Sequence, residues 1–150
     1  MEPEAAADVR NIVRAGLNDF NFRHSPTTDV VPVTIAARDS RNVLIGGLVG
    51  ELRPGWKWLY IAMLWVAEPY RIQGIGRRLL RAAEQEASRS GCMYAAVDTI
   101  SFQARGFYEK AGYTIFGVQE DYPPGHRRFY LRKNLSKDGI ESGEFGAVSR

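Results

Sequence analysis

The first half of the chain alternates between one long amphipathic pattern and two short apolar runs. Over residues 4–23, apolar side chains recur at helical spacing with charged and amide residues between them, which predicts one helix, or two with a break at Gly16. Apolar runs at 30–37 and 43–52, separated by a polar turn, predict a β-hairpin. The second run contains three glycines that indicate either a weakened strand or a bulge: Gly46, Gly47 and Gly50.

A proline and a glycine at 53–56 stand in the order of a type II turn and return the chain into its longest apolar run. That run, 58–66, has no polar interruption, which is typical of a central strand covered on both faces. An amphipathic helix follows and ends at Gly91, so the next strand, 94–98, should lie parallel to 58–66 by the right-handed crossover rule. The remaining predicted elements are a short helix beginning at 101 or 103 and ending at 110, and strands at 113–119 and 129–135.

Together these elements predict one α+β domain over residues 1–135. Its central sheet is mostly antiparallel, contains a parallel pair around the strand-to-helix turn and is flanked by helices. A length of 150 residues with 45% hydrophobic content suits a single core. Residues 136–150 are rich in serine, glycine and charge, and we predict a mobile tail there.

Composition narrows the class of protein. The formal net charge is only +3 with Lys and Arg scattered, so a nucleic-acid surface is not indicated. The single Cys92 excludes an internal disulfide, and no apolar run reaches the roughly twenty residues of a membrane span. The acidic N-terminus does not resemble a signal peptide, and we predict a cytoplasmic protein. His24 and His126 are far apart without metal-ligand spacing, which predicts no metal site.

The turn at 71–76 is the segment with the clearest chemistry. Gly74 and Gly76 remove side chains where the chain enters the helix, so the unpaired N–H groups of its first turn can reach a bulky anion at the positive end of the helix dipole. Leu79 stands where a dinucleotide fingerprint needs its third glycine, and the Gly-Lys-Ser/Thr of a nucleoside-triphosphate loop is absent. Taken alone, this turn is equally consistent with a phosphorylated cofactor and with no ligand.

Two segments carry a recognisable pair of motifs. Residues 71–76 read Arg-Ile-Gln-Gly-Ile-Gly and are preceded by Val66 and Pro69, while residues 104–113 read Ala-Arg-Gly-Phe-Tyr-Glu-Lys-Ala-Gly-Tyr. The first resembles the cofactor motif of the GNAT superfamily of acyl-CoA-dependent N-acetyltransferases, and the second is similar to that family's helix with a tyrosine before a glycine-aromatic strand entry. The resemblance extends over residues 30–135 and implies the GNAT-like fold.

The resemblance also implies a cofactor site. In it, the backbone of 73–77 binds the pyrophosphate, and a backbone N–H within 64–66, where the central strand splays from its neighbour, polarises the thioester carbonyl. Ser101 stands where many relatives carry an asparagine. The residues assigned to the cofactor are therefore Leu64, Trp65, Val66, Arg71, Ile72, Gln73, Gly74, Ile75, Gly76, Arg77 and Ser101.

Two side chains are candidates for proton transfer. Tyr108, with a reference pKa near 10, is predicted to protonate the departing thiolate; the alternative is a tyrosine that only packs against cofactor or core. The acceptor amine needs a base, and Asp98 at the end of an apolar strand is the tentative choice. Asp98 as a cap of the following turn and a water-mediated base both remain alternatives.

The function predicted is transfer of an acetyl group from acetyl-CoA to a primary amine, by direct attack in a ternary complex. The acceptor is a small molecule or a protein amine. A non-catalytic acyl-CoA-binding module is the alternative, and a basic nucleic-acid surface along the Arg71 to Arg81 stretch ranks third. Homodimers are common in the family, so a homodimer is a further expectation from the resemblance.

Overall fold

The computed structural model describes residues 7–25 and 29–136. Two short 3-10 turns, η1 and η2, precede and follow the third strand. The elements run in the order α1 (Ala7–His24), β1 (Val31–Arg38), β2 (Leu44–Arg53), η1 (Pro54–Trp56), β3 (Trp58–Val66), η2 (Glu68–Tyr70), α2 (Ile75–Arg89), β4 (Tyr94–Ile100), α3 (Arg105–Lys110), β5 (Thr114–Glu120) and β6 (Arg127–Asn134). The predicted tail lies outside the described residues, apart from Ser136.

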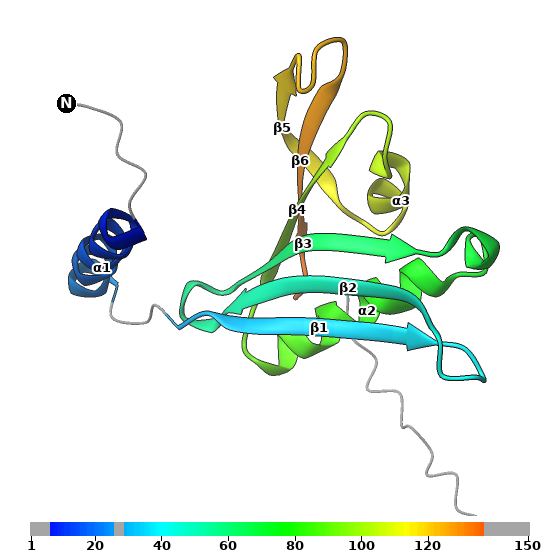
Figure 1. Ribbon diagram of the computed structural model, residues 1–150, viewed down its shortest axis with the longest axis horizontal. Coiled ribbons are helices and arrows are strands. Elements are labelled where there is room, and N and C mark those ends of the chain that lie inside the picture. The colour runs from blue at the N-terminus through cyan, green and yellow to red at the C-terminus, as the bar shows by residue number, and fades with distance from the viewer. Residues whose placement is uncertain (1–6, 26–28, 137–150) are drawn as a thin grey trace, which may run out of the picture.

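Within the described residues, the strands form one sheet of six in the order β1-β2-β3-β4-β6-β5. Only β3 and β4 are parallel, because α2 carries the chain back across the sheet between them; the remaining neighbours are antiparallel. The predicted fold class and the predicted parallel pair are therefore confirmed. Figure 1 shows α2 behind β1, β2 and β3, with α3 beside β4 and β6.

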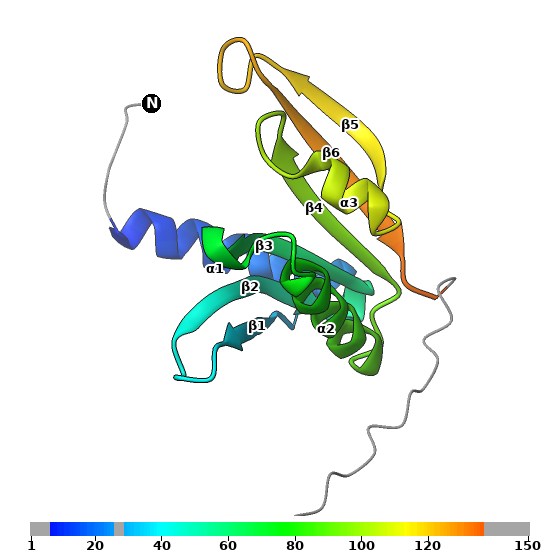
Figure 2. The same cartoon turned by 90° about the vertical axis from the view of Figure 1, so that its right-hand side faces the viewer.

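The core lies between the sheet and α2. Leucines from two strands, β2 and β3, are almost fully buried there, together with the apolar stripe of α2: Leu48, Leu52, Leu59, Leu79, Leu80, Ala83 and Ala87. Beyond this shared core, the half of the sheet formed by β1, β2 and β3 and the half formed by β4, β6 and β5 diverge from each other (Figure 2). This divergence leaves an opening between β3 and β4.

The expectation that β3 is covered on both faces is wrong. Leu59 and Ile61 are buried toward α2, whereas Tyr60, Met63 and Trp65 are 40%, 62% and 52% exposed. Aromatic and sulfur-containing side chains make the run look continuously apolar in sequence, but α2 and α3 both lie on the same side of the sheet. The opposite side, which carries Tyr60, Met63 and Trp65, is referred to below as the open face.

One of the three glycines of β2, Gly50, lies opposite a bulge whose extra residue, Ala62, belongs to β3. The β2–β3 register shifts between Val49 and Gly50, so that Val49 pairs with Met63 and Gly50 pairs with Ile61. A Cβ at Gly50 would collide with the carbonyl oxygen of Tyr60. Glycine is therefore required where the two backbones approach most closely.

One local prediction about a turn differs from the structure. Residues 54–56 form a 3-10 turn and not a type II turn, because the left-handed conformation falls on Lys57 (φ 67°) and not on Gly55.

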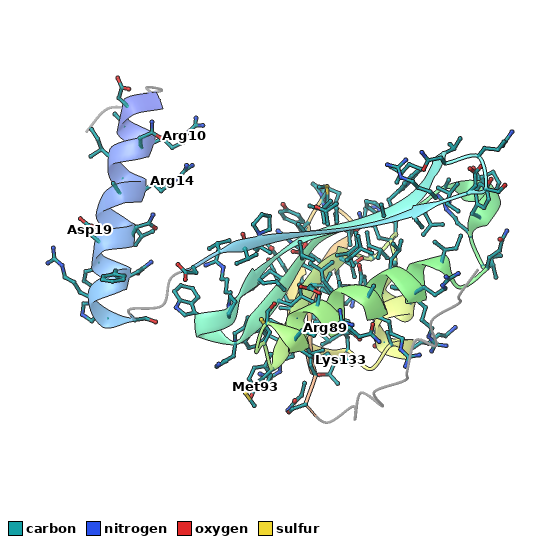
Figure 3. All side chains as sticks on the ribbon, turned by 90° about the horizontal axis from the view of Figure 1, so that it is seen from below. Arg10, Arg14, Asp19, Arg89, Met93 and Lys133 are labelled. Carbon is teal, nitrogen blue, oxygen red and sulfur yellow. The ribbon has the colours of Figure 1, made fainter. Side chains whose placement is uncertain are left out.

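The first helix is continuous through Gly16 and stands apart from the sheet, as seen from below in Figure 3.

A buried polar cluster ties α2 to the far half of the sheet. The Tyr113 hydroxyl donates to Glu84 Oε1 at 3.0 Å, and Lys133 Nζ lies 3.1 Å from Glu84 Oε2. Burial, followed by the Glu84 charge, raises the pKa of Tyr113, which keeps the phenol a donor to the carboxylate. Because a buried carboxylate without partners is costly, this cluster requires α2, β6 and the residue before β5 to meet in one arrangement.

Replacing Gly50 with alanine should destabilise the fold by about 2 kcal/mol, because the new Cβ forces β2 away from the Tyr60 carbonyl of β3. Urea denaturation followed by circular dichroism measures the change in the free energy of unfolding. Gly106→Ala is the control, since a Cβ there meets nothing within 4 Å. Equal stabilities for the two variants would contradict the role assigned to the bulge.

Candidate active site

A cleft of about 730 Å³ opens between the end of β3, the start of α2 and the helix α3. All the residues predicted for the cofactor line it except Gln73 and Ser101. One wall comes from the strand end and the turn, and the opposite wall comes from the β4–α3 connection and α3. The predicted residues that line the cleft are Leu64, Trp65, Val66, Arg71, Ile72, Gly74, Ile75, Gly76 and Arg77.

The turn between η2 and α2 has an unusual backbone. Ile72 has a φ of 66° and is fully exposed, and Gly74 has a φ of 77° at the helix N-cap. A β-branched residue in the left-handed region is strained, so other contacts have to hold this turn in place. Arg71 Nε donates to the Val66 carbonyl at 3.1 Å, and Gln73 Nε2 donates to the Pro69 carbonyl at 3.0 Å. Gln73 therefore braces the turn from outside the cleft.

The first turn of α2 presents free backbone donors to the cleft. The Arg78 N–H donates to the Gly74 carbonyl at 3.0 Å, so the helical hydrogen bonds begin there. Among the described residues, the N–H groups of Ile75, Gly76 and Arg77 have no acceptor. They lie at the positive end of the dipole of a 15-residue helix, with the Arg77 side chain beside them. This geometry suits a phosphate-bearing ligand.

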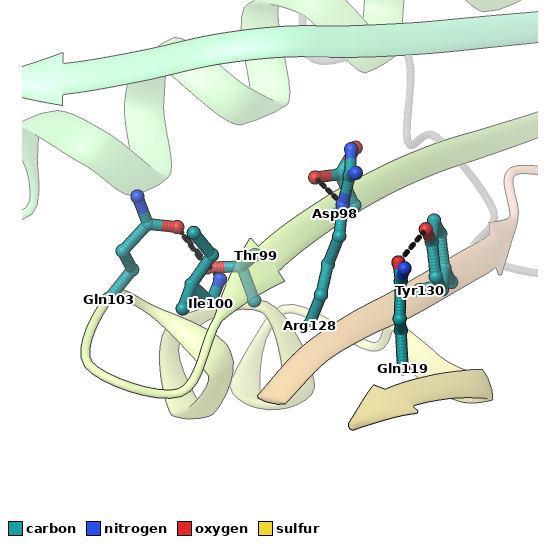
Figure 4. Close-up of polar contacts among 7 residues, drawn as sticks. All are labelled: Asp98, Thr99, Ile100, Gln103, Gln119, Arg128 and Tyr130. Atoms are coloured by element: carbon teal, nitrogen blue, oxygen red, sulfur yellow. Dashed lines mark hydrogen bonds and ion pairs between the residues drawn. The ribbon is translucent and has the colours of Figure 1, made fainter. Parts of the chain in front are cut away.

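The opposite wall consists of side chains that the sequence analysis did not single out. Phe102, Gln103, Phe107 and Lys110 line it, with Phe107 and Lys110 one turn apart on α3. Gln103 Oε1 accepts hydrogen bonds from the Ile100 N–H at 2.8 Å and from Thr99 Oγ1 at 3.2 Å, which holds the connection in place (Figure 4). The i, i+3 spacing of Phe107 and Lys110 is the signal that could have placed them on one face.

The opening between β3 and β4 lies beside this cleft. Parallel pairing runs from Trp58 opposite Tyr94 to Ile61 opposite Val97 and then stops. Past that point β3 stays paired with β2, and β4 stays paired with β6, so the facing edges of β3 and β4 separate. A splay is therefore present, as the resemblance implied, and Leu64, Trp65 and Val66 lie on the separated part of β3.

Tyr108 lies beneath Phe107 and does not line the cleft itself. It is only 5% exposed, and its ring packs against the rings of Phe107 and Tyr113 at centroid distances of 5.1 and 5.7 Å. Its hydroxyl has no hydrogen-bond partner among the described residues. Burial, followed by the negative charge of Asp98, raises the pKa of Tyr108 to about 12. The phenol therefore keeps its proton at neutral pH, with no neighbouring acceptor to compete for it.

Asp98 is the first residue of β4 past the pairing with β3, and its register partner Tyr130 lies on β6. Its Oδ2 accepts a hydrogen bond from Arg128 Nε at 2.7 Å, while Oδ1 has no partner in the described part of the chain (Figure 4). This bond raises the pKa of Arg128. The Arg128 guanidinium also lies over the rings of Tyr122 and Tyr130. Asp98 is thus an ion-pair partner and does not cap the turn.

Ser101 belongs to a separate small cavity of about 290 Å³ and not to the cleft. Its Oγ lies 3.1 Å from His126 Nδ1 and accepts a hydrogen bond from the Arg127 N–H at 3.3 Å. The side chain therefore joins the end of β4 to the start of β6. A residue in the position of the family's asparagine was a reasonable candidate, but the local hydrogen bonds turn it away from the cleft.

The remaining reactive groups have structural surroundings. Cys92 is buried and its thiol lies 3.4 Å from the Trp58 carbonyl; burial raises the pKa of this thiol, which suits a packed side chain. Among residues 7–25 and 29–136, no three His, Cys, Asp or Glu side chains cluster to hold a metal ion. In the same residues, no helix is long and apolar enough to cross a membrane.

Comparison with known proteins agrees with this geometry. The sequence model of the acetyltransferase (GNAT) family matches residues 8–113. Blasticidin-S acetyltransferase from Streptomyces morookaense is 38% identical over 118 residues, which cover 76% of this chain and 85% of that protein. Acetyltransferase Atu2258 from Agrobacterium fabrum (strain C58) is 36% identical over 131 residues, covering 87% and 94% of the two chains.

The crystal structure of an acetyltransferase from Bacillus cereus ATCC 14579 superimposes with a TM-score of 0.82 at 28% identity. The match covers 89% of this chain and 96% of that one. The relatives found in this way are named acetyltransferases, which decides against the non-catalytic alternative raised by the sequence. Family match, sequence relatives and fold together show that the chain belongs to the GNAT family and is an acetyltransferase.

Proposed function

We propose that this acetyltransferase takes its acetyl group from acetyl-CoA and transfers it to a primary amine in a ternary complex. One observation carries the proposal: the free N–H groups at the start of α2 and the splay between β3 and β4 border the same region of the molecule. A phosphorylated carrier held at the helix end can thus extend its acyl group toward the opening in the sheet.

The pyrophosphate of coenzyme A is the ligand best suited to the turn. The N–H groups of Ile75, Gly76 and Arg77 supply donors, and Arg77 supplies charge without the need for a metal ion. The apolar parts of the cleft, from Leu64, Phe102 and Phe107, suit the pantetheine arm. A solved Bacillus anthracis (strain Ames) structure in complex with acetyl coenzyme A matches at 25% identity with a TM-score of 0.61, which supports this choice.

The proposed chemistry uses the splay as the reaction site. The acceptor nitrogen attacks the thioester carbonyl carbon, the C–N bond forms, the C–S bond breaks, and the thiolate leaves. A backbone N–H on the separated part of β3 polarises the carbonyl oxygen. Tyr108 gives its proton to the thiolate, which suits a phenol that has no other acceptor. The amine loses its proton to Asp98 Oδ1 or to a water that Asp98 positions.

The acceptor reaches the splay from the open face, since α2 and α3 occupy the other side of the sheet. The relative named for blasticidin-S favours a small-molecule amine over a protein amine. Ring faces and one ion pair on this side, from Tyr60, Trp65, Tyr130 and the Asp98–Arg128 pair, suit an acceptor with both a cationic and a planar part.

Gly76→Val should reduce the affinity for coenzyme A at least tenfold, because the side chain would enter the space bordered by the Phe107 ring and Val66. Gly76→Ala is the matched control: its Cβ would lie 3.4 Å from Phe107, which is an ordinary contact. Isothermal calorimetry with coenzyme A measures both. Unchanged affinity in a folded Gly76→Val protein would exclude this turn as the binding site.

Tyr108→Phe removes only the hydroxyl and should lower kcat on the order of a hundredfold, with little change in coenzyme A binding. Release of free thiol from acetyl-CoA across a panel of amines measures turnover. Tyr113→Phe is the matched control, because its hydroxyl serves Glu84. That variant should lose stability and keep its turnover. A Tyr108→Phe enzyme within about twofold of the parent would leave Tyr108 as a packing residue.

Replacing Asp98 with asparagine separates its two roles. If Asp98 serves as the base, Asp98→Asn should lower turnover by about a hundredfold, whereas Arg128→Gln, which breaks the same ion pair but keeps the carboxylate, should cost far less. The pH dependence of kcat/KM, measured for both variants by thiol release, makes the comparison. Equal losses would show that only the ion pair matters.

A further inference from the structure

Helix α1 carries an apolar stripe that is exposed in the described part of the chain. Five apolar side chains at helical spacing lie on one side of it and are between 36% and 70% exposed: Val9, Ile12, Val13, Leu17 and Phe20. Arg10, Arg14 and Asp19 lie outside the stripe (Figure 3). A helix with such a stripe gains most of its stability by packing the stripe against another surface. Contiguous apolar surface of this kind marks an interface.

The open face of the sheet is the complementary surface in the same molecule. The β2–β3 register places Val49 opposite Met63, and Gly47 opposite Trp65. Because the extra residue of the bulge, Ala62, shifts the alternation of β3 by one residue, Tyr60 lies on this face too. Val49, Tyr60, Met63 and Trp65 are between 38% and 62% exposed. A sheet face with this composition needs a cover, and an amphipathic helix is a suitable one.

The direction of α1 decides whose sheet it covers. Trp56 Nε1 donates a hydrogen bond to Ser25 Oγ at 3.0 Å, which attaches the C-terminal end of α1 to the end of the sheet where β3 begins. From that attachment the helix leads away from its own sheet (Figures 1 and 3). The Bacillus cereus structure covers 89% of this chain, which is more than residues 29–150 alone could supply. Its superposition therefore extends into the N-terminal segment that contains α1.

We propose that two copies of this chain exchange α1, so that each helix packs its apolar stripe on the open face of the other copy. A two-fold pair of this kind is the closed, self-complementary arrangement expected of exchanged elements. The helix has 18 residues and is about 27 Å long. Two such helix-on-sheet contacts bury on the order of 1,500 Å² or more, the size of a stable specific interface.

The exchange would also complete the acceptor side of the active site. The open face contains the edge of β3 past Ile61 and the carboxylate of Asp98, both beside the splay. A partner helix over Met63 and Trp65 would therefore form one wall of the space through which the acceptor arrives. This consequence rests on the proposed function, whereas the exchange itself rests only on the apolar surfaces.

Sedimentation velocity tests the exchange without any activity assay. The parent protein should sediment as a dimer at micromolar concentration, and Leu17→Asp should sediment as a monomer because a carboxylate in the stripe cannot be buried. Asn18→Asp adds the same charge one residue away, outside the stripe, and should remain dimeric. Leu17 is 57% exposed within its own chain, so circular dichroism should show each variant folded. A monomeric parent, or a dimer that survives Leu17→Asp, would overturn the proposal.

Mixing two deficient variants distinguishes exchange from a helix that folds back on its own sheet. Met63→Glu spoils the open face, and Leu17→Asp spoils the helix, so each alone should be monomeric. With exchange, the intact helix of the Met63→Glu copy packs on the intact face of the Leu17→Asp copy, and the mixture should recover dimers of mixed composition. A mixture that contains only monomers would mean that each helix covers its own sheet, and would overturn the exchange. These readouts stay valid whether or not acetyl-CoA is the donor.

Discussion

The end of the hydrogen bonds between β3 and β4 is the constraint on which the rest of this structure depends. The two strands pair as far as Ile61 and Val97 and then follow different partners, because β3 continues along β2 and β4 continues along β6. Two features keep them apart: the bulge at Ala62, opposite Gly50, changes the direction of β3, and the rings of Phe107 and Tyr108 on α3 pack at the opening. The sheet thus contains a gap that no single element could produce.

The position of α2 follows from the same constraint. A parallel pair needs a crossover, and a right-handed one starts the helix where β3 ends. The unpaired N–H groups of its first turn therefore lie beside the gap, and the positive end of the helix dipole is directed into the cleft. The Glu84 cluster then holds the other half of the sheet to the same helix. The turn between η2 and α2 and the splay between β3 and β4 both result from the same path of the chain.

The open face shows where an apolar pattern misleads. In the run 58–66 every residue counts as apolar, yet the structure alternates buried leucine and isoleucine with exposed tyrosine, methionine and tryptophan. The sequence contains no sign of this, because side-chain hydrophobicity does not say on which side of a sheet the helices lie. For the same reason the apolar spacing of α1 does not show which surface its stripe covers. Its partner surface depends on how the chain is directed at Ser25 and Trp56.

Local sequence determined the element types, the bounds of β3 and the start of α2. The spacing of apolar residues and the glycines Gly74 and Gly91 affect only the conformation of the few residues around them. It also predicted most of the residues that line the cleft. Tertiary structure alone decided that Ser101 bonds to His126, that Asp98 pairs with Arg128, and that the Tyr108 ring is buried against Phe107 and Tyr113. Each of these depends on a contact between β4 or α3 and a residue elsewhere in the chain. Such contacts are set by packing and register, which short-range patterns in a sequence do not encode.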